Sequence, residues 1–333
     1  MTTLRTFNII GVGKYLPKKS VSSVEVESEL HLPQGWINQY IGVDTRYIAE
    51  TESNAEMGAN ALQAALNSAG LNIEAIDCLI SGAATFDHVI PNRSALIKAE
   101  FTQAESLDFP CIDINTVCTS FITALDYASL LIDSGAYKTI AIVTSEISSK
   151  GLDPQSTETY CLFGDCATAI IITQAPSGGL IKHVLKTYSE GARNTIIEGG
   201  GNKYHPKDYP YTPSMYSFKM DGKKLLRLAN QHLEVFISDF FETVPGGMEE
   251  VTWIVPHQAS KLGLKMLKTM KGVSPEKVID QLTQYGNCIA ASIPLALITS
   301  IEEKKIKEND TCFLIGTAAG MSISGLLLKY TSS

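Results

Sequence analysis

Hydrophobic and polar positions along the chain follow two patterns in turn, one typical of buried strands and one typical of amphipathic helices. Their alternation predicts strands that alternate with helices. Continuous apolar runs at 138–146 (KTIAIVTSE) and 165–174 (DCATAIIITQ) are typical of strands buried on both faces of a sheet. Apolar residues three or four positions apart predict amphipathic helices at 118–137, with a stop near Gly135, and at 222–241. This alternation favours an α/β protein in which helices cover parallel sheets.

The order of these elements repeats in the second half of the chain. Residues 118–146 and 286–320 share the order loop, helix, strand, loop, although few residues are identical. The pattern predicts an internal duplication of about 150 residues, with halves at 1–174 and 175–333. Functional groups in such sheets gather where strands end and helices begin. Two copies related by a pseudo-twofold axis would therefore bring both sets of ends to one place.

Residues 186–218 interrupt this rhythm. The segment is rich in Gly, Pro and Tyr and has little periodicity, so it is either a functional lid or a tolerated insertion. Its tyrosines, Tyr204, Tyr209, Tyr211 and Tyr216, either line a substrate mouth or pack within the loop.

Composition restricts the class of protein. The 333 residues are 44% hydrophobic and 19% charged, a normal globular balance. The formal charge of -8 repels nucleic acid and anionic membranes, so neither is expected as a partner. The seven cysteines lack metal-type spacing, and neither a signal peptide nor a membrane-spanning run is visible. We therefore expect a soluble, reduced, cytoplasmic protein without metal.

Three residues at element boundaries are candidates for chemistry. Cys118 begins a predicted helix, where unpaired N–H groups favour the thiolate, so it is either a nucleophile or a buried structural cysteine. His257 ends an apolar strand and is either a functional group or a histidine satisfied by local hydrogen bonds. Asn287 precedes a helix and is either a catalytic donor or a helix cap.

Together, Cys, His and Asn in this order form a nucleophile with two polar groups. The same order occurs in papain-like proteases, so a thiol hydrolase is one interpretation. The cysteine signature of that class is missing, and the α/β pattern and the expected reducing compartment do not fit it.

Several motifs resemble those of the β-ketoacyl-acyl-carrier-protein synthase III group of the thiolase superfamily. These are GWINQYIGVDTRYIAE, VCTSFITALDYASLLIDSGAYKTIAIVTSE, DPQSTETYCLFGDCATAIII, MDGKKLLRLA, VPHQAS and YGNCIAASIPLAL. The resemblance runs nearly end to end. It implies a thiolase-like fold of two pseudo-repeated α/β halves, which form a layered α-β-α-β-α core, and it implies a homodimer.

The resemblance also implies roles for individual residues. Cys118 would carry an acyl group as a thioester, and His257 and Asn287 would hydrogen-bond the carbonyl of a malonyl thioester and stabilise the enolate left by decarboxylation. The N–H groups of Cys118 and Ala319 would hold the tetrahedral oxyanion. Phe163 would keep water out, or would simply pack in the core.

Some positions depart from the family pattern, so the priming substrate is open although the chemistry looks intact. Such departures occur in members recruited to secondary metabolism. Trp36 is retained at a position that contacts coenzyme A, and Ile90 falls at a pocket position contributed across the dimer. The residues that differ are Thr119, Ser120, Cys288, Ile289, Tyr40, Thr157 and Ser260.

The predicted function is a type III ketosynthase that takes acyl and malonyl thioesters from coenzyme A or an acyl carrier protein and needs no cofactor. Lys261, Lys265 and Lys268 share a helical face after His257, and Arg227 matches a basic family position. This basic stripe either holds an acidic carrier protein or is an ordinary solvated face. Two alternatives remain: an acyltransferase acting on an oxygen or nitrogen nucleophile, and a non-catalytic partner subunit.

Overall fold

The structure, a computed structural model, describes residues 5–332 and contains two large β-sheets. In spatial order, the first sheet consists of β1 (Phe7–Tyr15), β7 (Cys166–Gln174), β6 (Thr139–Glu146), β4 (Cys78–Gly82) and β5 (Cys111–Ile114). The second consists of β8 (Gly179–Thr187), β13 (Ser322–Lys329), β12 (Thr311–Ala318) and β11 (Trp253–Pro256). Two short ribbons lie outside them, β2 (Lys19–Ser22) with β3 (Thr45–Ile48) and β9 (Thr195–Ile196) with β10 (Lys219–Met220).

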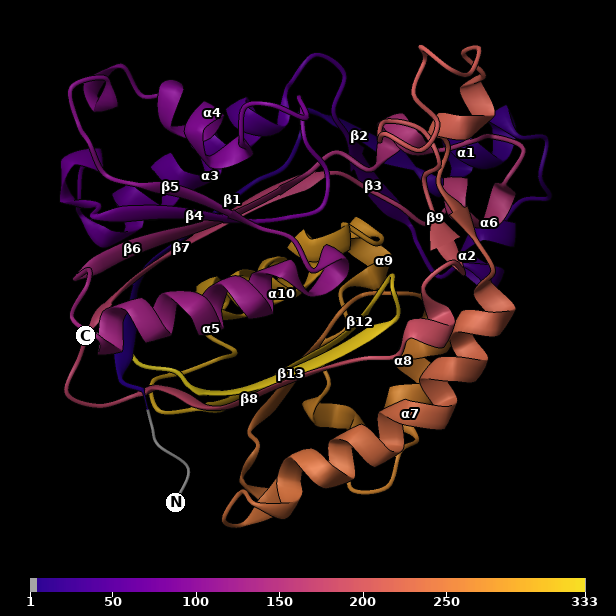
Figure 1. Ribbon diagram of the computed structural model, residues 1–333. Helices are drawn as coiled ribbons and strands as arrows, with labels where there is room; N and C mark the ends of the chain where they lie inside the picture. The colour runs from indigo at the N-terminus through magenta and orange to yellow at the C-terminus, as the bar shows by residue number, and fades with distance from the viewer. Residues whose placement is uncertain (1–4, 333) are drawn as a thin grey trace.

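Helices lie between the two sheets and on their outer faces (Figure 1). Helix α3 packs on the outer face of the first sheet, α5 and α10 fill the space between the sheets, and α7 packs on the outer face of the second. The predicted α-β-α-β-α layering is confirmed. The helices are α1 (Ser23–Glu29), α2 (Trp36–Tyr40), α3 (Asn54–Ala69), α4 (Arg93–Ala99), α5 (Ser120–Asp133), α6 (Thr157–Tyr160), α7 (Gly222–Glu242), α8 (Lys261–Lys268), α9 (Leu282–Tyr285) and α10 (Ser292–Glu302).

The two halves correspond element by element. β1 and β8 begin at Phe7 and Gly179, and β6 and β12 begin at Thr139 and Thr311, so in both of these pairs the second-half strand starts 172 residues after its counterpart. An isolated parallel bridge from β11 to Val278 takes the place of the pairing between β4 and β5. The repeat is therefore longer than the predicted one. The boundary between residues 174 and 175 stays a prediction.

The sheets are mixed rather than parallel, which corrects the sequence-based expectation. β7 is antiparallel to β1 and β6, and β13 is antiparallel to β12 and β8. Parallel pairing is limited to β4 with β5 and β6 and to β11 with β12. Residues 319–321 alone link β12 to β13, which is too short for the crossover that a parallel neighbour requires.

Close packing of α3 on β1 shows how the sequence sets the layer spacing. Ser53 and Glu56 form a capping box at the start of α3, and Gly70, with φ 65°, ends the helix. A Cβ at Gly11 or Gly13 would lie only 2.4 or 2.3 Å from a carbonyl oxygen of α3. The strand continues through these glycines to Tyr15, and the missing side chains let the helix approach it closely.

No helix within residues 5–332 is long and apolar enough to cross a bilayer. The same residues contain no group of three or more His, Cys, Asp or Glu side chains arranged to hold a metal ion. All seven cysteines are free thiols, and five are buried, whereas Cys111 and Cys118 keep partial access to solvent. Cys118 is therefore not sealed inside the fold.

Candidate active site

Cys118 lies in a short 3₁₀ turn, Val117–Thr119, between the end of β5 and the start of α5. The helix begins at Ser120, two residues later than predicted. Asn115 Oδ1 accepts a hydrogen bond from the N–H of Val117 at 2.9 Å, which holds that residue at φ 54°. Ser120 Oγ accepts one from Thr116 N at 2.9 Å. These contacts fix the turn that presents the thiol.

The turn of Cys118 packs against β12 and against a second 3₁₀ turn, Ile289–Ala291, which follows Asn287. Gly316 of β12 lies between the turn of Cys118 and His257. A Cβ at this position would be 3.2 Å from His257 Cβ and 3.3 Å from Thr119 Cγ2. The structure therefore brings the three predicted residues to one place, although they are 30 or more positions apart in the chain.

His257 follows β11 and is neutral. Its backbone N–H donates to Ile315 O at 2.8 Å, and the residue is 6% exposed. Burial lowers the pKa of His257 from 6.5 to about 4. Its buried Nδ1 has no partner among residues 5–332, so the predicted alternative of a histidine satisfied by local hydrogen bonds does not describe this ring.

The Asn287 side chain is held in one orientation. Its Oδ1 accepts from Ile289 N at 2.9 Å, and its Nδ2 donates to Ala259 O at 3.2 Å, so it is both a turn residue and a buried donor. The second Nδ2 hydrogen is free to donate elsewhere. Phe163 forms a backbone bridge with Asn287 and packs edge-to-face on Phe218, with ring centroids 5.1 Å apart.

The electrostatics at Cys118 differ from the sequence-based expectation of an easily ionised thiol. Although the residue keeps partial access to solvent, burial of its sulphur, together with the nearby Glu146 carboxylate, raises the pKa of Cys118 to about 12. Hydrogen bonds from the backbone N–H groups of Ala319 and of Cys118 itself lower the pKa, but their effect is smaller than that of burial. The thiol is therefore protonated at neutral pH, and the two predicted oxyanion donors face its sulphur.

Glu146 is a group that sequence reasoning missed. It ends β6, is fully buried, and accepts hydrogen bonds from Ala84 N at 2.7 Å and from Thr85 N and Oγ1 at 2.8 and 2.6 Å. Burial raises its pKa. A carboxylate closing an otherwise apolar strand was the signal in the sequence. Its role is to anchor the loop that follows β4 beside Cys118.

The predicted contacts for the thioester carrier lie beyond His257. Ser260 caps α8, accepting from Gly263 N at 3.1 Å. Lys261 Nζ donates to Asn38 O at 3.1 Å and Gln39 O at 2.9 Å, so its ammonium holds α2. A groove of about 460 Å³ runs between α2 and α8 and includes Lys265.

Two predicted contacts are exposed in the single chain. Arg227 lies on the surface of α7, and Ile90 is 85% exposed in the loop after β4. In the 186–218 segment the tyrosines pack in pairs, Tyr204 with Tyr209 and Tyr211 with Tyr216, each with ring centroids 5.3 Å apart. These pairs support the interpretation of packing within the loop.

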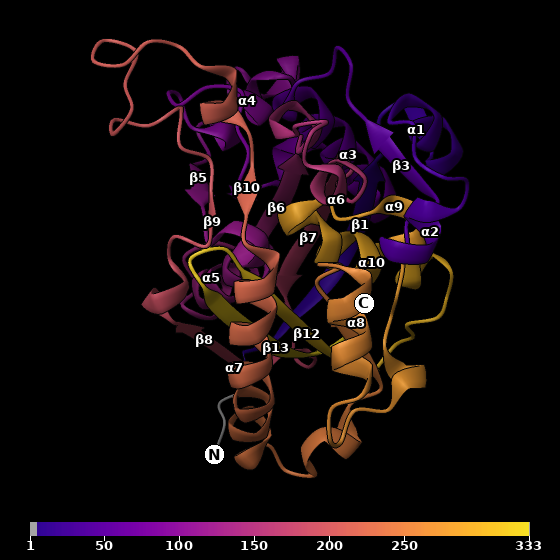
Figure 2. The same cartoon turned by 90° about the vertical axis from the view of Figure 1, so that its right-hand side faces the viewer.

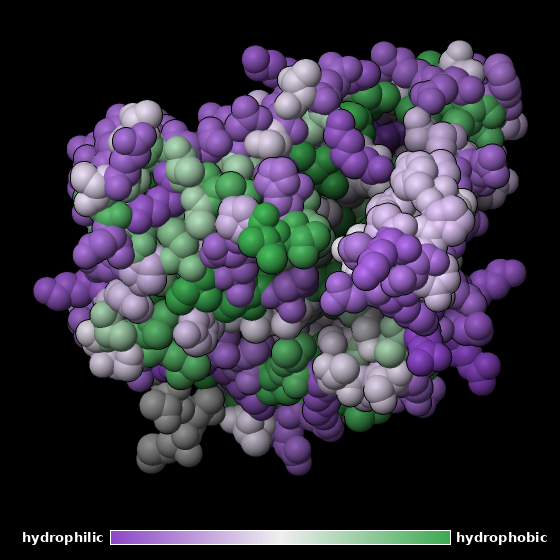
Figure 3. Space-filling view, turned by 45° about the horizontal axis from the view of Figure 1, so that its top comes forward, coloured by the Kyte–Doolittle hydropathy of each residue, from purple (hydrophilic) through white to green (hydrophobic). Residues whose placement is uncertain are grey.

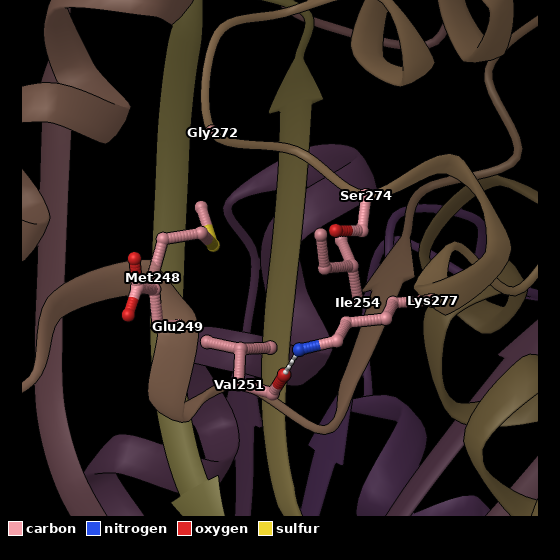
Figure 4. Close-up of a pocket in the computed structure, with 7 residues that line it drawn as sticks. All are labelled: Met248, Glu249, Val251, Ile254, Gly272, Ser274 and Lys277. Carbon is pink, nitrogen blue, oxygen red and sulfur yellow. Dashed lines mark hydrogen bonds between the residues drawn. The ribbon is translucent and has the colours of Figure 1, made fainter.

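A smaller cavity of about 140 Å³ lies elsewhere, beside β11 (Figure 4). Lys277 spans it and donates to Val251 O at 2.6 Å. Its lining includes no residue predicted to act in catalysis. The lining residues are Met248, Glu249, Val251, Ile254, Gly272, Ser274 and Lys277.

The duplicated five-layer fold, with cysteine on one central turn and histidine and asparagine beside the other, defines a thiolase-fold enzyme. Residues 112–189 match the family described as 3-oxoacyl-[acyl-carrier-protein (ACP)] synthase III, and residues 245–330 match its C-terminal part. A β-ketoacyl-[acyl-carrier-protein] synthase III of Clostridium perfringens is 32% identical over 323 residues, 96% of this chain and 98% of the relative. The chain therefore belongs to the β-ketoacyl-[acyl-carrier-protein] synthase III family, as its motifs predict.

Solved structures agree with this assignment. The 3-oxoacyl-[acyl-carrier-protein] synthase III of Aquifex aeolicus has a TM-score of 0.87 at 28% identity, covering 98% of this chain and 100% of that one. The priming β-ketosynthase of the R1128 polyketide pathway has a TM-score of 0.88 at 26% identity, covering 100% and 99%. The thiolase-like fold is thus confirmed.

Proposed function

We propose that this chain is a type III ketosynthase that acylates Cys118 and condenses the acyl group with a malonyl thioester. The observation that carries the proposal is a pair of buried hydrogen-bond donors beside the thiol. His257 is kept neutral by burial, and Asn287 is oriented by Ile289 N and Ala259 O. Two uncharged donors in a partly desolvated site suit an enolate oxygen.

In the first step, the Cys118 sulphur attacks the carbonyl of an acyl thioester. The S–H proton leaves to a base, for which His257 is the candidate, and the carrier departs as a thiol after protonation. The N–H groups of Cys118 and Ala319 stabilise the tetrahedral oxyanion. Because the thiol is protonated at rest, its deprotonation has to accompany attack.

In the second step, the malonyl carboxylate leaves as carbon dioxide and its bonding electrons form an enolate. Hydrogen bonds from His257 and Asn287 to the thioester carbonyl oxygen stabilise that charge. The enolate carbon then attacks the acyl carbonyl, the C–S bond to Cys118 breaks, and the released thiolate takes up a proton from solvent. The product is a β-ketoacyl thioester. Phe163, packed on Phe218, shields this step from water.

Intact-protein mass spectrometry tests the first step. Incubation with acyl thioesters of several chain lengths is expected to add one acyl mass, located on Cys118, and the C118A variant is expected to gain none. A wild-type chain that gains no acyl mass from coenzyme A or carrier-protein donors would contradict the proposal.

Carbon dioxide release from malonyl thioester separates the ketosynthase from an acyltransferase. A transferase acting on an oxygen or nitrogen nucleophile needs no enolate donor, so N287A would leave its rate nearly unchanged. We expect N287A to abolish most decarboxylation while acylation of Cys118 persists.

We further propose a homodimer. The loop after β4 exposes Phe86, Val89 and Ile90 to 51, 70 and 85%, and β5 is an edge strand. Apolar side chains reach the surface in groups on the face shown in Figure 3. Light scattering is expected to give the mass of two chains, and I90D is expected to shift it toward one. A monomeric wild-type protein would end this part of the proposal.

The remaining features of the proposal concern conditions and pathway. The chemistry above uses only side chains and backbone N–H groups, so we propose that the reaction needs no metal or redox cofactor. A chelator is then expected to leave the condensation rate unchanged. A specialised biosynthetic pathway and a cytoplasmic location stay predictions, which product analysis and cell fractionation would check.

A further inference from the structure

We infer that a hydrogen-bonded tether between α5 and the second sheet sets the position of Cys118. Its members, which act as positioning residues, are Asp126, His183 and Ser324. The inference rests on the proposed function and concerns how its nucleophile is aligned. Cys118 comes from the first half of the chain, whereas His257 and Ala319 come from the second. Alignment of the thiol therefore depends on contacts that cross between the halves.

The tether runs from α5 through β8 to β13. Asp126 Oδ2 lies 3.0 Å from Nδ1 of His183, and Nε2 of the same ring lies 3.1 Å from Ser324 Oγ. Arg5 pairs with the other carboxylate oxygen of Asp126. A hydroxyl can donate or accept a hydrogen bond, so the contact with Ser324 persists whether the imidazole is neutral or charged. In both views of the ribbon, α5 lies beside β8 and β13 (Figure 1, Figure 2).

The groups of the tether are largely shielded from solvent. The side chains of Asp126 and His183 are 22% and 10% exposed, and Ser324 is fully buried. Burial opposes ionisation of Asp126, but hydrogen bonds and charge from His183 and Arg5 hold the pKa of this carboxyl below its ordinary value. The carboxylate is therefore charged at neutral pH. Hydrogen bonds to a charged group are roughly twice as strong as those between neutral groups.

The same three residue types in this order form the catalytic triad of serine hydrolases. Hydrolysis requires that the hydroxyl reach a substrate, and Ser324 is fully buried in β13. The arrangement therefore holds elements of the fold together and does not supply a second nucleophile.

The tether lies next to the place where the turn of Cys118 meets the second sheet. Ser324 is the cross-strand partner of Gly316, which lies against Thr119. Asp126 follows Thr119 by seven positions, so both lie on one face of α5. The helix is thus fixed on the second sheet at two points, one beside Cys118 and one two turns further on.

Apolar packing by itself would not define the position of α5 so closely. Its buried faces carry mainly small or apolar side chains, such as Phe121, Leu125 and Ala128. Apolar contacts are non-directional, whereas hydrogen bonds require alignment. Asp126 lies six residues after the start of α5, about 9 Å along its axis, so a tilt of about 6° there would move the Cys118 turn by about 1 Å. A misplacement of that size can lower a rate by about 10²-fold.

Separate measurement of the two half-reactions tests the inference. H183L keeps much of the side-chain volume but removes both hydrogen bonds. We expect it to slow acylation of Cys118 by about 10- to 100-fold. Carbon dioxide release from malonyl thioester should stay within about twofold of wild type, because the enolate donors His257 and Asn287 both belong to the second half. Intact-protein mass spectrometry and carbon dioxide release measure the two rates, at a temperature at which unfolding curves show each variant to be folded.

Two further variants serve as controls. H183N places an amide nitrogen where Nδ1 donates to Asp126, so it should restore acylation to within about threefold of wild type. E302Q breaks the ion pair with Lys14 through which α10 of the second half contacts β1 of the first. That pair also crosses between the halves but does not involve α5, so both rates should stay within about twofold of wild type.

Two results would overturn the inference. Unchanged acylation in H183L would show that the tether does not position the thiol. Equal losses of acylation and decarboxylation would show a general loss of structure. If H183L does not fold, S324A removes one hydrogen bond and should slow acylation about threefold without slowing decarboxylation. A wild-type chain that is never acylated would instead reject the proposed function, and the inference with it.

Discussion

Two turns at the centre of the molecule have the same backbone but different chemistry. In the first, Asn115 Oδ1 holds Val117 N and Ser120 Oγ holds Thr116 N, all at 2.9 Å. In the second, 172 residues later, Asn287 and Ser292 make the same two hydrogen bonds to Ile289 and Cys288, also at 2.9 Å. Val117 and Ile289 both have positive φ, 54° and 49°. The duplication is thus preserved down to single hydrogen bonds.

The difference lies in what each turn presents. The first places Cys118 where the second places Ala290. Strand registers place Gly82 of the first half where the second half has His257. Asn115 is exposed, whereas Asn287 is buried and its amide is directed by Ala259 O. One scaffold used twice therefore supplies the nucleophile from one copy and the hydrogen-bond donors from the other.

Moving the thiol between the turns should produce the largest effect. C118A is expected to lower the condensation rate by about 10⁴-fold or more, because no other group forms the thioester. The double variant C118A and A290C restores a thiol at the equivalent position of the second turn. The double variant should remain inactive and unacylated, because the new thiol would not face the hydrogen-bond donors that surround Cys118. Intact-protein mass spectrometry measures the acylation. Acylation of the new thiol would show that the two turns are interchangeable.

The two asparagines should separate catalysis from folding. N287A is expected to slow malonyl decarboxylation by roughly 10²- to 10³-fold, the loss typical of one oxyanion-type donor. N115A removes the same turn contact and should cost about 1 kcal/mol of unfolding free energy, with less than a tenfold change in decarboxylation. Carbon dioxide release and urea unfolding measure the two effects. Equal rate losses would mean that both asparagines act only through the turns.

Acidification should destabilise the second half through His257. Its folded pKa of about 4 is below the ordinary value of 6.5, so the unfolded chain binds the proton first. The contribution of this group to the free energy of unfolding has its full value above about pH 6.5. It falls by about 3 kcal/mol as the pH drops toward 4. The H257Q variant, which cannot titrate there, should lose that much less between pH 7 and pH 4 in urea unfolding. Parallel losses in both proteins would refute the burial argument.

The serines that begin α5 and α10, Ser120 and Ser292, should give the most symmetrical effects. S120A and S292A each leave a backbone N–H, of Thr116 or Cys288, without its partner, at a cost of about 1 to 2 kcal/mol. Thermal unfolding should show similar decreases for both. S120A should in addition slow acylation of Cys118, and S292A should slow decarboxylation. A large asymmetry in stability would indicate that the two turns are not equivalent in energy.

Much of the fold was predictable from local sequence. Apolar runs located β6 and β7, helical spacing located α5 and α7, and the repeat of element order indicated two halves. The antiparallel direction of β7 and β13 was not predictable, because their pairing with β1 and β8 depends on contacts between segments that are distant in the chain. The length of the repeat followed only from register across the sheets.

By itself, the sequence determined which side chains are available for chemistry: Cys118, His257 and Asn287, each at an element boundary, within motifs of one family. The tertiary structure alone decided their states. It made the thiol hard to ionise, kept the imidazole neutral, and placed the Lys261 ammonium on backbone carbonyls of α2. The reason is physical: burial, dielectric environment and long-range hydrogen bonds depend on segments that meet only when the chain has folded.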